Sequence, residues 1–188
     1  MDEQQATESS AEPADCPRAY GFLTAVDSPI HGIFGGYLLV DPLGRPLEFH
    51  CTAPVKVSRA QQILFGSTLK PQLHGQQIGG TLLAEGTIQP QVVLTDLEPM
   101  MHVRGHTSLP VALVRGAPGR ETMADSMVSA AATGAGSFAV GKATVSPHVH
   151  DAVRASELVE MLGELATAVD LCEPFERIRA AIEEAQRH

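Results

Sequence analysis

The chain has 188 residues, 44% of them hydrophobic and only 4% aromatic, so we expect one sizeable core built mainly from aliphatic side chains. The formal net charge is −9, but residues 1–15 carry five acids and no base, and the body from 16 to 150 is nearly neutral. Without a basic patch for a phosphate backbone, nucleic acid is not an expected partner.

The three cysteines are not arranged in a disulfide or zinc pattern, because none of them belongs to a Cys-x-x-Cys pair. The first 15 residues lack the basic and apolar regions of a signal peptide. No apolar run approaches the roughly 18–20 residues that cross a bilayer. These features predict a cytoplasmic protein that does not engage a membrane.

The first elements along the chain are an acidic tail and an antiparallel meander. Residues 1–17 are polar, acidic and without periodicity, which predicts disorder. The runs 19–26, 34–40 and 47–49 are β-prone. Between the last two runs, the segment 41–44 (Asp-Pro-Leu-Gly) predicts a tight turn closed by a glycine at positive φ.

A helical region is predicted next. Ser58 and Gln61 have the spacing of a capping box, and Gly66 is placed to end this short helix. A second helical piece is predicted over residues 69–85, although its proline and three glycines leave the boundaries open.

Strands and helical turns alternate after this region. The segments 91–96 and 109–114 read as strands buried on both faces, and residues 97–106 as one or two helical turns between them. Residues 115–150 are rich in Gly, Ala, Ser and Thr and predict a loop or linker with a brief strand near residues 137–140.

The last 38 residues carry two amphipathic helices. Leucines and one valine recur at spacings of 4, 3 and 4 over residues 158–169, and apolar residues at 3, 4 and 3 over 175–185. We therefore divide the chain into a tail (1–17), an α/β core domain (18–114), a linker (115–150) and a C-terminal helical hairpin (151–188).

A histidine beside a cysteine in the strand "LEFHC" raises the question of a site. Successive side chains alternate between the faces of a strand, so Cys51 joins the apolar face and His50 joins Glu48 on the polar face. We therefore expect Cys51 to be a small core residue and His50 to be solvated or paired across the strand, rather than a shared metal site.

Other histidines offer two candidate metal sites. His102 and His106 stand at i and i+4, which on an α-helix places both rings on one face at a spacing used by zinc sites. His148 and His150 could chelate from one extended face, but they precede Asp151, which favours a helix-capping role.

Two aspartates stand at the ends of predicted strands. Asp27 follows the apolar run "FLTAV" and Asp96 follows "VVLT". On adjacent strands their carboxylates would meet at one edge of the sheet, where close acids hold Mg²⁺ or Mn²⁺. The alternative is that Asp27 opens a turn and Asp96 caps the next helix.

The order of elements resembles the ribonuclease H-like architecture: three antiparallel strands, a helical crossing, a strand, a short helix, a strand and a late helix. This is a resemblance of element order and of the strand-end positions of Asp27 and Asp96. It implies an α/β fold with a mixed sheet of about five strands. Enzymes of that superfamily usually add a third acid from the first long helix, but here no acid occurs between Glu48 and Glu85.

Two functions are compatible with these features. The first is a non-enzymatic binding or regulatory module without a cofactor, whose C-terminal helices recognise a protein partner or a second copy of the chain. The alternative is a ribonuclease H-like, Mg²⁺- or Mn²⁺-dependent phosphodiester hydrolase that uses Asp27 and Asp96.

Overall fold

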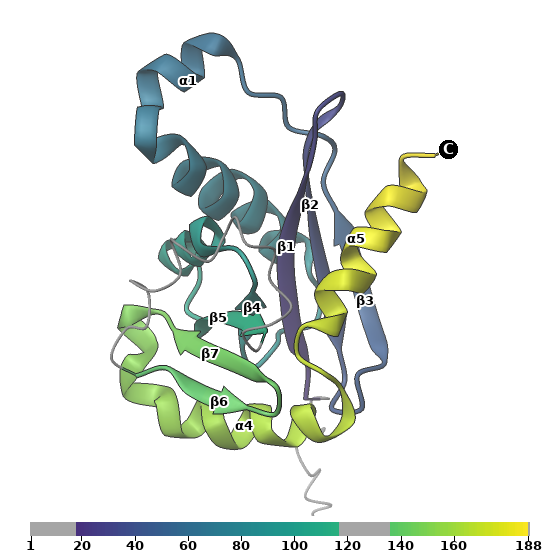
Figure 1. Ribbon diagram of the computed structural model, residues 1–188, viewed down its shortest axis with the longest axis vertical. Coiled ribbons are helices and arrows are strands. Elements are labelled where there is room, and N and C mark those ends of the chain that lie inside the picture. Colours follow the sequence, from purple (N-terminus) through teal and green to yellow (C-terminus); the bar gives the residue numbers. More distant parts are fainter. Residues whose placement is uncertain (1–17, 117–135, 188) are drawn as a thin grey trace, which may run out of the picture.

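A mixed sheet of seven strands forms the centre of the computed structural model, which describes residues 18–116 and 136–187 (Figure 1). The strands lie in the order β3-β2-β1-β4-β5-β7-β6. Their bounds are β1 Tyr20–Ser28, β2 Gly32–Val40, β3 Pro46–Cys51, β4 Val93–Thr95, β5 Val111–Gly116, β6 Phe138–Val140 and β7 Ala143–Pro147. The predicted tail and residues 117–135 of the predicted linker fall outside the described residues.

The sheet has the predicted ribonuclease H-like order over its first five strands. β1, β2 and β3 form the antiparallel meander, and β4 and β5 pair parallel to β1 and to each other. The predicted turn is present, because Gly44 has φ +75° and Asp41 accepts from the backbone of Leu43 and Arg45. The α/β fold class is confirmed, with two more strands than predicted.

The two additional strands come from residues that were assigned to a linker. β6 was expected as a brief strand, but β7 was not, and it pairs antiparallel with β5. The short sequence of β7, "ATVSP", contains β-branched Thr144 and Val145, whose signal was obscured by the surrounding small residues. The sheet therefore continues to residue 147.

Helical segments cover both faces of the sheet. Their bounds are α1 Arg59–Phe65, η1 Gly66–Thr68, η2 Pro71–Gly80, α2 Thr81–Glu85, η3 Glu98–His106, η4 Val149–Arg154, α4 Ala155–Ala168 and α5 Glu173–Ala185. The capping box of Ser58 and Gln61 is formed, and Gly66 ends α1. The predicted second helix contains the π-helix η2, followed by the short α2.

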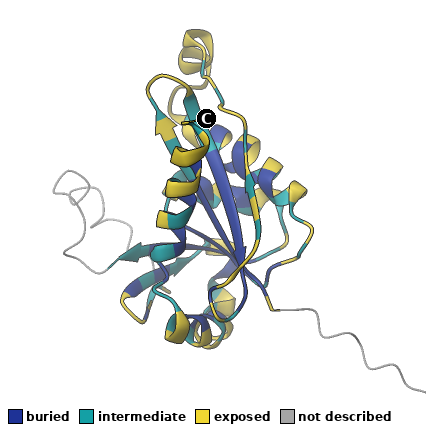
Figure 2. Ribbon diagram, turned by 90° about the vertical axis from the view of Figure 1, so that its right-hand side faces the viewer, coloured by how far each residue is buried: buried dark blue, intermediate teal, exposed yellow. Residues whose placement is uncertain are grey.

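Two hydrophobic clusters lie on opposite sides of the strands. Even-numbered residues of β1, such as Phe22, pack with α4 and α5, whereas odd-numbered ones, such as Leu23, pack with η2, α2 and η3. Figure 2 shows the buried strands between the more exposed helices. The result is a three-layer arrangement.

Two adjacent glycines of β2 set how closely the helical layers approach. A Cβ atom on Gly35 would lie 2.1 Å from Ile78 Cγ2 of η2, and one on Gly36 would lie 2.2 Å from Ile178 Cγ2 of α5. Because neighbouring strand residues face opposite sides of the sheet, each glycine allows the helix on its own side to pack closely against the strand.

The C-terminal helices do not form the predicted hairpin. Both predicted helices exist, with Leu158, Leu162 and Leu165 buried in α4 and Ile178 and Ile182 in α5. However, α5 lies along β1 and β2, whereas α4 lies beneath β6 and β7 (Figure 1). Their apolar stripes are thus used within the chain's own core. In the described ranges no helix has the length and apolar character that crossing a bilayer requires.

Candidate active-site edge

The carboxyl end of β4 carries a partly buried network of three side chains. Asp96 follows β4 directly, and its Oδ1 accepts a hydrogen bond of 2.6 Å from Thr24 Oγ1 of β1. Its Oδ2 accepts from Nη2 of Arg179 on α5. Thr24 is fully buried, whereas the Arg179 side chain keeps 38% of its surface exposed. We call these three residues the strand-end network.

Asp27 does not join this network. It lies three residues beyond Thr24 on β1, at an odd position, and therefore faces the η2 layer, whereas Asp96 faces α5. Asp27 instead lies close enough to His74 of η2 to oppose the lowering of the histidine pKa by burial. The predicted meeting of Asp27 and Asp96 is wrong, because Thr24 stands level with Asp96 on the neighbouring strand, and Asp27, three residues further along β1, faces the other side of the sheet.

The residues around Asp96 do not fit a two-metal centre. Both of its oxygens are engaged, one by a hydroxyl and one by a guanidinium. Across residues 18–116 and 136–187 no three His, Cys, Asp or Glu side chains are grouped so that they could hold an ion. The positive charge beside the carboxylate comes from Arg179 itself.

Sequence reasoning missed Thr24 and Arg179. Thr24 was a detectable signal, because it is the one polar residue within the apolar run "FLTAV". Arg179 follows directly after the buried Ile178, and only the position of α5 against the sheet brings its guanidinium to Asp96.

The histidine pair His102 and His106 is also separated. Both belong to η3, a 3-10 helix, in which residues four apart lie about 120° apart around the axis. His102 lines a cavity with His148, whereas His106 lines a different cavity with Tyr37. The prediction that they share a metal is therefore wrong.

The segment of His148, His150 and Asp151 caps η4 through His148, whereas Asp151, the expected cap, lies within η4 and bonds to other elements. His148 Nδ1 accepts from the His150 backbone at the start of η4. Asp151 is buried and accepts from Arg104 Nε at 2.8 Å and from the Val111 backbone at 3.0 Å. This ion pair joins η4, η3 and β5.

The strand "LEFHC" contains a structural pair and not a metal site. His50 Nε2 lies 3.1 Å from Glu48 Oε2, as expected for the polar face. Glu48 also accepts from the Thr87 hydroxyl and from the Thr87 and Ile88 backbone, and the bonds from Thr87 and His50 lower its pKa to about 2. Cys51 is exposed, contrary to the prediction, because β3 is an edge strand and α5 packs mainly on β1 and β2.

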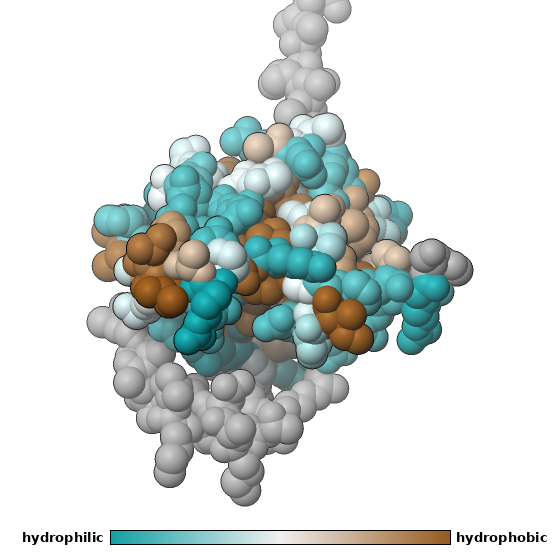
Figure 3. Space-filling view, turned by 90° about the horizontal axis from the view of Figure 1, so that it is seen from above, coloured by the Kyte–Doolittle hydropathy of each residue, from teal (hydrophilic) through white to brown (hydrophobic). Residues whose placement is uncertain are grey.

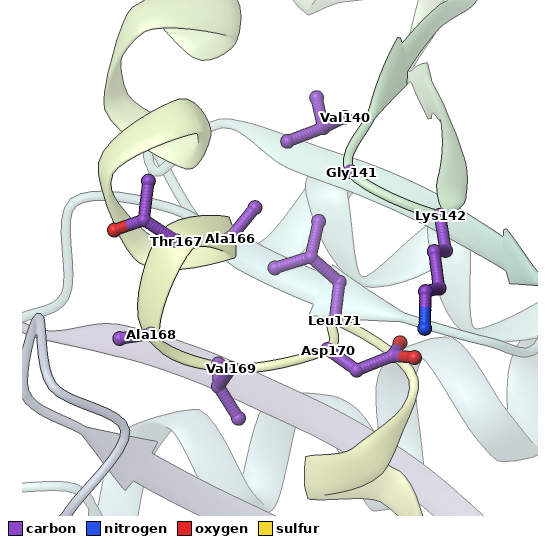
Figure 4. Close-up of a pocket in the computed structure, with 9 residues that line it drawn as sticks. All are labelled: Val140, Gly141, Lys142, Ala166, Thr167, Ala168, Val169, Asp170 and Leu171. Atoms are coloured by element: carbon purple, nitrogen blue, oxygen red, sulfur yellow. The ribbon is translucent and has the colours of Figure 1, made fainter.

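A cavity of about 280 Å³ lies between the β6–β7 turn and the segment joining α4 to α5 (Figure 4). Its charged residues are Lys142 and Asp170, whose side chains extend to the same side of the cavity. Asp170 Oδ1 accepts from the Cys172 backbone, which fixes the turn before α5. We therefore assign Asp170 a structural role in this turn and no role in a functional site.

The end of the molecule toward which β1 runs carries exposed apolar and cationic residues. Ile63 and Leu64 of α1 are 68% and 82% exposed, and Ile30 at the β1–β2 tip is 80% exposed. Separate brown patches on this end are visible in Figure 3. Residues 49–84 contain three cations, at positions 56, 59 and 70, and no acid.

Comparisons with known proteins found similarity only at the level of structure. No family model and no curated protein matches the sequence. Two solved structures of Ciona intestinalis endonuclease V, both in complex with DNA containing an inosine, are 14% identical. The first covers 77% of this chain and 77% of its own, with a TM-score of 0.42. The second covers 90% of this chain and 87% of its own, with a TM-score of 0.45. Human ENDOV is 16% identical over 91% of this chain and 89% of its own, with a TM-score of 0.39.

These comparisons correct two expectations. The prediction of a non-enzymatic binding or regulatory module, and the prediction that nucleic acid is not a partner, are contradicted, because the similar structures include endonucleases bound to DNA. Since identity is 14–16% and the TM-scores lie below 0.5, residue roles are not transferred from these proteins to this chain.

Proposed function

We propose that this chain acts on nucleic acid and contacts a phosphodiester at the strand-end network. The observation that carries the proposal is Arg179, a guanidinium placed at the carboxyl ends of the central strands and still 38% exposed. Arginine presents five N–H donors in a planar fork that suits phosphate, and one of its nitrogens is engaged by Asp96. Asp96 and Thr24 would orient the fork.

Residues 49–84, which contain no acid, support the same proposal. β4 and β5 run parallel to β1, so their carboxyl ends point toward the end of the molecule that carries α1 (Figure 1). Lys56, Arg59 and Lys70 are exposed in that segment. Exposed cations at this end of the molecule are suited to contacts with the phosphates of a nucleic acid.

Hydrolysis of the phosphodiester with Mg²⁺ or Mn²⁺ is the second candidate function. It is favoured by the carboxylate of Asp96 at the end of β4, next to β1 in the ribonuclease H-like strand order. As arranged, Thr24 and Arg179 occupy this carboxylate, so no catalytic step follows from the geometry. The cytoplasm is the proposed compartment, on the basis of the exposed thiol of Cys51, which forms no disulfide.

Binding is tested with a fluorescently labelled single-stranded DNA of about 20 nucleotides, with fluorescence anisotropy measured at several salt concentrations. We expect affinity to fall as salt rises, because phosphate contacts release counterions. Arg179→Ala should weaken binding about tenfold, which is the effect of losing one charged hydrogen bond.

Arg187→Ala is the matched control, because Arg187 also lies near the end of the chain but pairs with exposed Glu184. Equal weakening by both variants, or no binding by the parent at low salt, would contradict the proposal. Thermal melts of each variant separate lost binding from lost folding.

Hydrolysis is tested on the same DNA with Mg²⁺ or Mn²⁺ added. If the strand-end network is the site, cleavage should disappear in Asp96→Asn and persist in Asp27→Asn, because Asp27 faces the other side of the sheet. If cleavage depends equally on both aspartates, the strand-end network is not the site, and a metal site shared by Asp27 and Asp96 would be supported instead.

A further inference from the structure

A second cavity lies at the opposite end of β4 from Asp96. Its volume is about 330 Å³, within the lower part of the range of small-molecule sites. The segment before β4, the segment before β5 and the end of η2 with α2 enclose it against β2.

Tyr37 is the distinctive residue of this wall. Its side chain is only 1% exposed, and its hydroxyl makes no hydrogen bond to any described residue. The other tyrosine of the chain, Tyr20, is equally buried, yet its hydroxyl donates to the Met161 carbonyl at 3.2 Å. The Tyr37 hydroxyl does not count among the fully buried atoms without a partner, so it keeps contact with solvent and is open to an acceptor on a ligand.

The ring of Tyr37 is held in place. His50 stacks on it at 6.5 Å between centroids. A Cβ on Gly21 would lie 2.8 Å from the Tyr37 hydroxyl oxygen, and one on Gly86 would lie 3.2 Å from Cε1, so two glycines leave room for it. Burial raises the pKa of Tyr37, which keeps the hydroxyl protonated.

The cavity wall carries no Asp, Glu, Lys or Arg side chain among the described residues. Glu48 lies behind Thr87, but its oxygens already accept from Thr87 and Ile88. The wall combines apolar Leu83, Pro90 and Leu109 with polar Thr87, Gln89 and His106. Such a wall suits an uncharged ligand, since a charge here would lose hydration without gaining a partner.

We propose that this cavity binds a small neutral molecule whose apolar body carries a hydrogen-bond acceptor for the Tyr37 hydroxyl. The ligand class is that of carboxamides and lactams. The site is separate from the strand-end network, because it lies at the amino ends of β4 and β5.

The test is calorimetric titration of the full chain with nicotinamide, benzamide and uracil. At least one should bind with a Kd below about 10 mM, and nicotinate, which has the shape of nicotinamide with a negative charge, should bind at least tenfold more weakly. Tyr37→Phe should weaken the bound amide about fivefold, as expected for the loss of one neutral hydrogen bond.

Tyr20→Phe is the matched control, since it removes a buried hydroxyl on the other face of the sheet. Because the chain has two tyrosines and no tryptophan, the tyrosine emission of Tyr20→Phe reports on Tyr37 alone and should change on binding. The proposal is overturned if none of the three amides binds, if nicotinate binds as tightly as nicotinamide, or if Tyr37→Phe and Tyr20→Phe have equal effects.

Discussion

At the scale of single residues, Glu48 shows how one carboxylate can join distant parts of the chain. It lies on β3, and its partners Thr87 and Ile88 lie in the segment that leads to β4. The hydrogen bonds from Thr87 and His50 lower the pKa of Glu48 to about 2, whereas an unfolded glutamate titrates near 4.3.

The pH dependence of stability follows from this shift. Because the folded-state pKa is below the unfolded value, the contribution of Glu48 is complete above about pH 5 and is lost as the pH falls toward 2. Urea unfolding at pH 6, 4 and 2.5 should show a smaller acid-induced loss of stability in Glu48→Gln than in the parent. Identical pH profiles for the two proteins would contradict this role.

Individual residues also mark what the sequence could not predict. The pairing of His50 with Glu48 followed from strand alternation alone and is confirmed. The strand-end network could not be predicted, because Thr24, Asp96 and Arg179 are joined by pairing of β1 with β4 and by the position of α5. Cys51 was misplaced because alternation separates the two faces of a strand but does not say whether a helix covers either.

At the scale of elements, the glycine pair of β2 fixes the distance between the sheet and its helices. Gly35→Ala should push η2 away, and Gly36→Ala should push α5 away, because each new methyl group would meet an isoleucine. Overpacking of this kind typically costs about 1–3 kcal/mol. The expected fall in thermal midpoint is roughly 2–10 °C for a chain of this size.

Gly163→Ala provides the control, because a Cβ at this position of α4 meets nothing within 4 Å. Alanine is a better helix former than glycine, so this variant should be as stable as the parent or more so. Unchanged midpoints in the two β2 variants would show that the helices move aside without cost.

Helix ends and turns were predicted well, since their signals are local. The capping box at Ser58 and the glycine turn at Gly44 are both present. Helix type was not predicted: residues 71–80 form a π-helix and 98–106 a 3-10 helix, and the latter separates His102 from His106. These geometries depend on packing against the sheet, which periodicity in the sequence does not report.

At the scale of the whole molecule, the uneven charge bears on the proposed binding of nucleic acid. The net charge of −9 includes five acids and no base from residues 1–15. A chain lacking residues 2–15 should therefore bind single-stranded DNA more tightly at low salt, and the difference should shrink as salt rises. Anisotropy titrations of both chains check this, and an unchanged or weaker affinity of the shortened chain would contradict it.

The order of the first five strands was predictable because each strand has its own apolar run and the helical crossings are long enough to identify. The extension of the sheet by β7 was not, since its pairing with β5 joins residues about 30 apart across a region of small side chains. The assignment of α4 and α5 to a hairpin failed for a related reason, because their apolar stripes match the sheet as well as each other.

The uncovered position of β3 has a consequence for the protein at high concentration. An edge strand presents unpaired backbone N–H and C=O groups, with which a strand of a second chain can pair. On β3, Leu47 and Phe49 are also exposed. Pro46 begins β3 and Pro54 follows it closely, while exposed Arg45 stands at its entry. Prolines cannot donate to a growing ladder and charges disfavour stacking, so this short border of the sheet is protected at both ends against fibrillar growth.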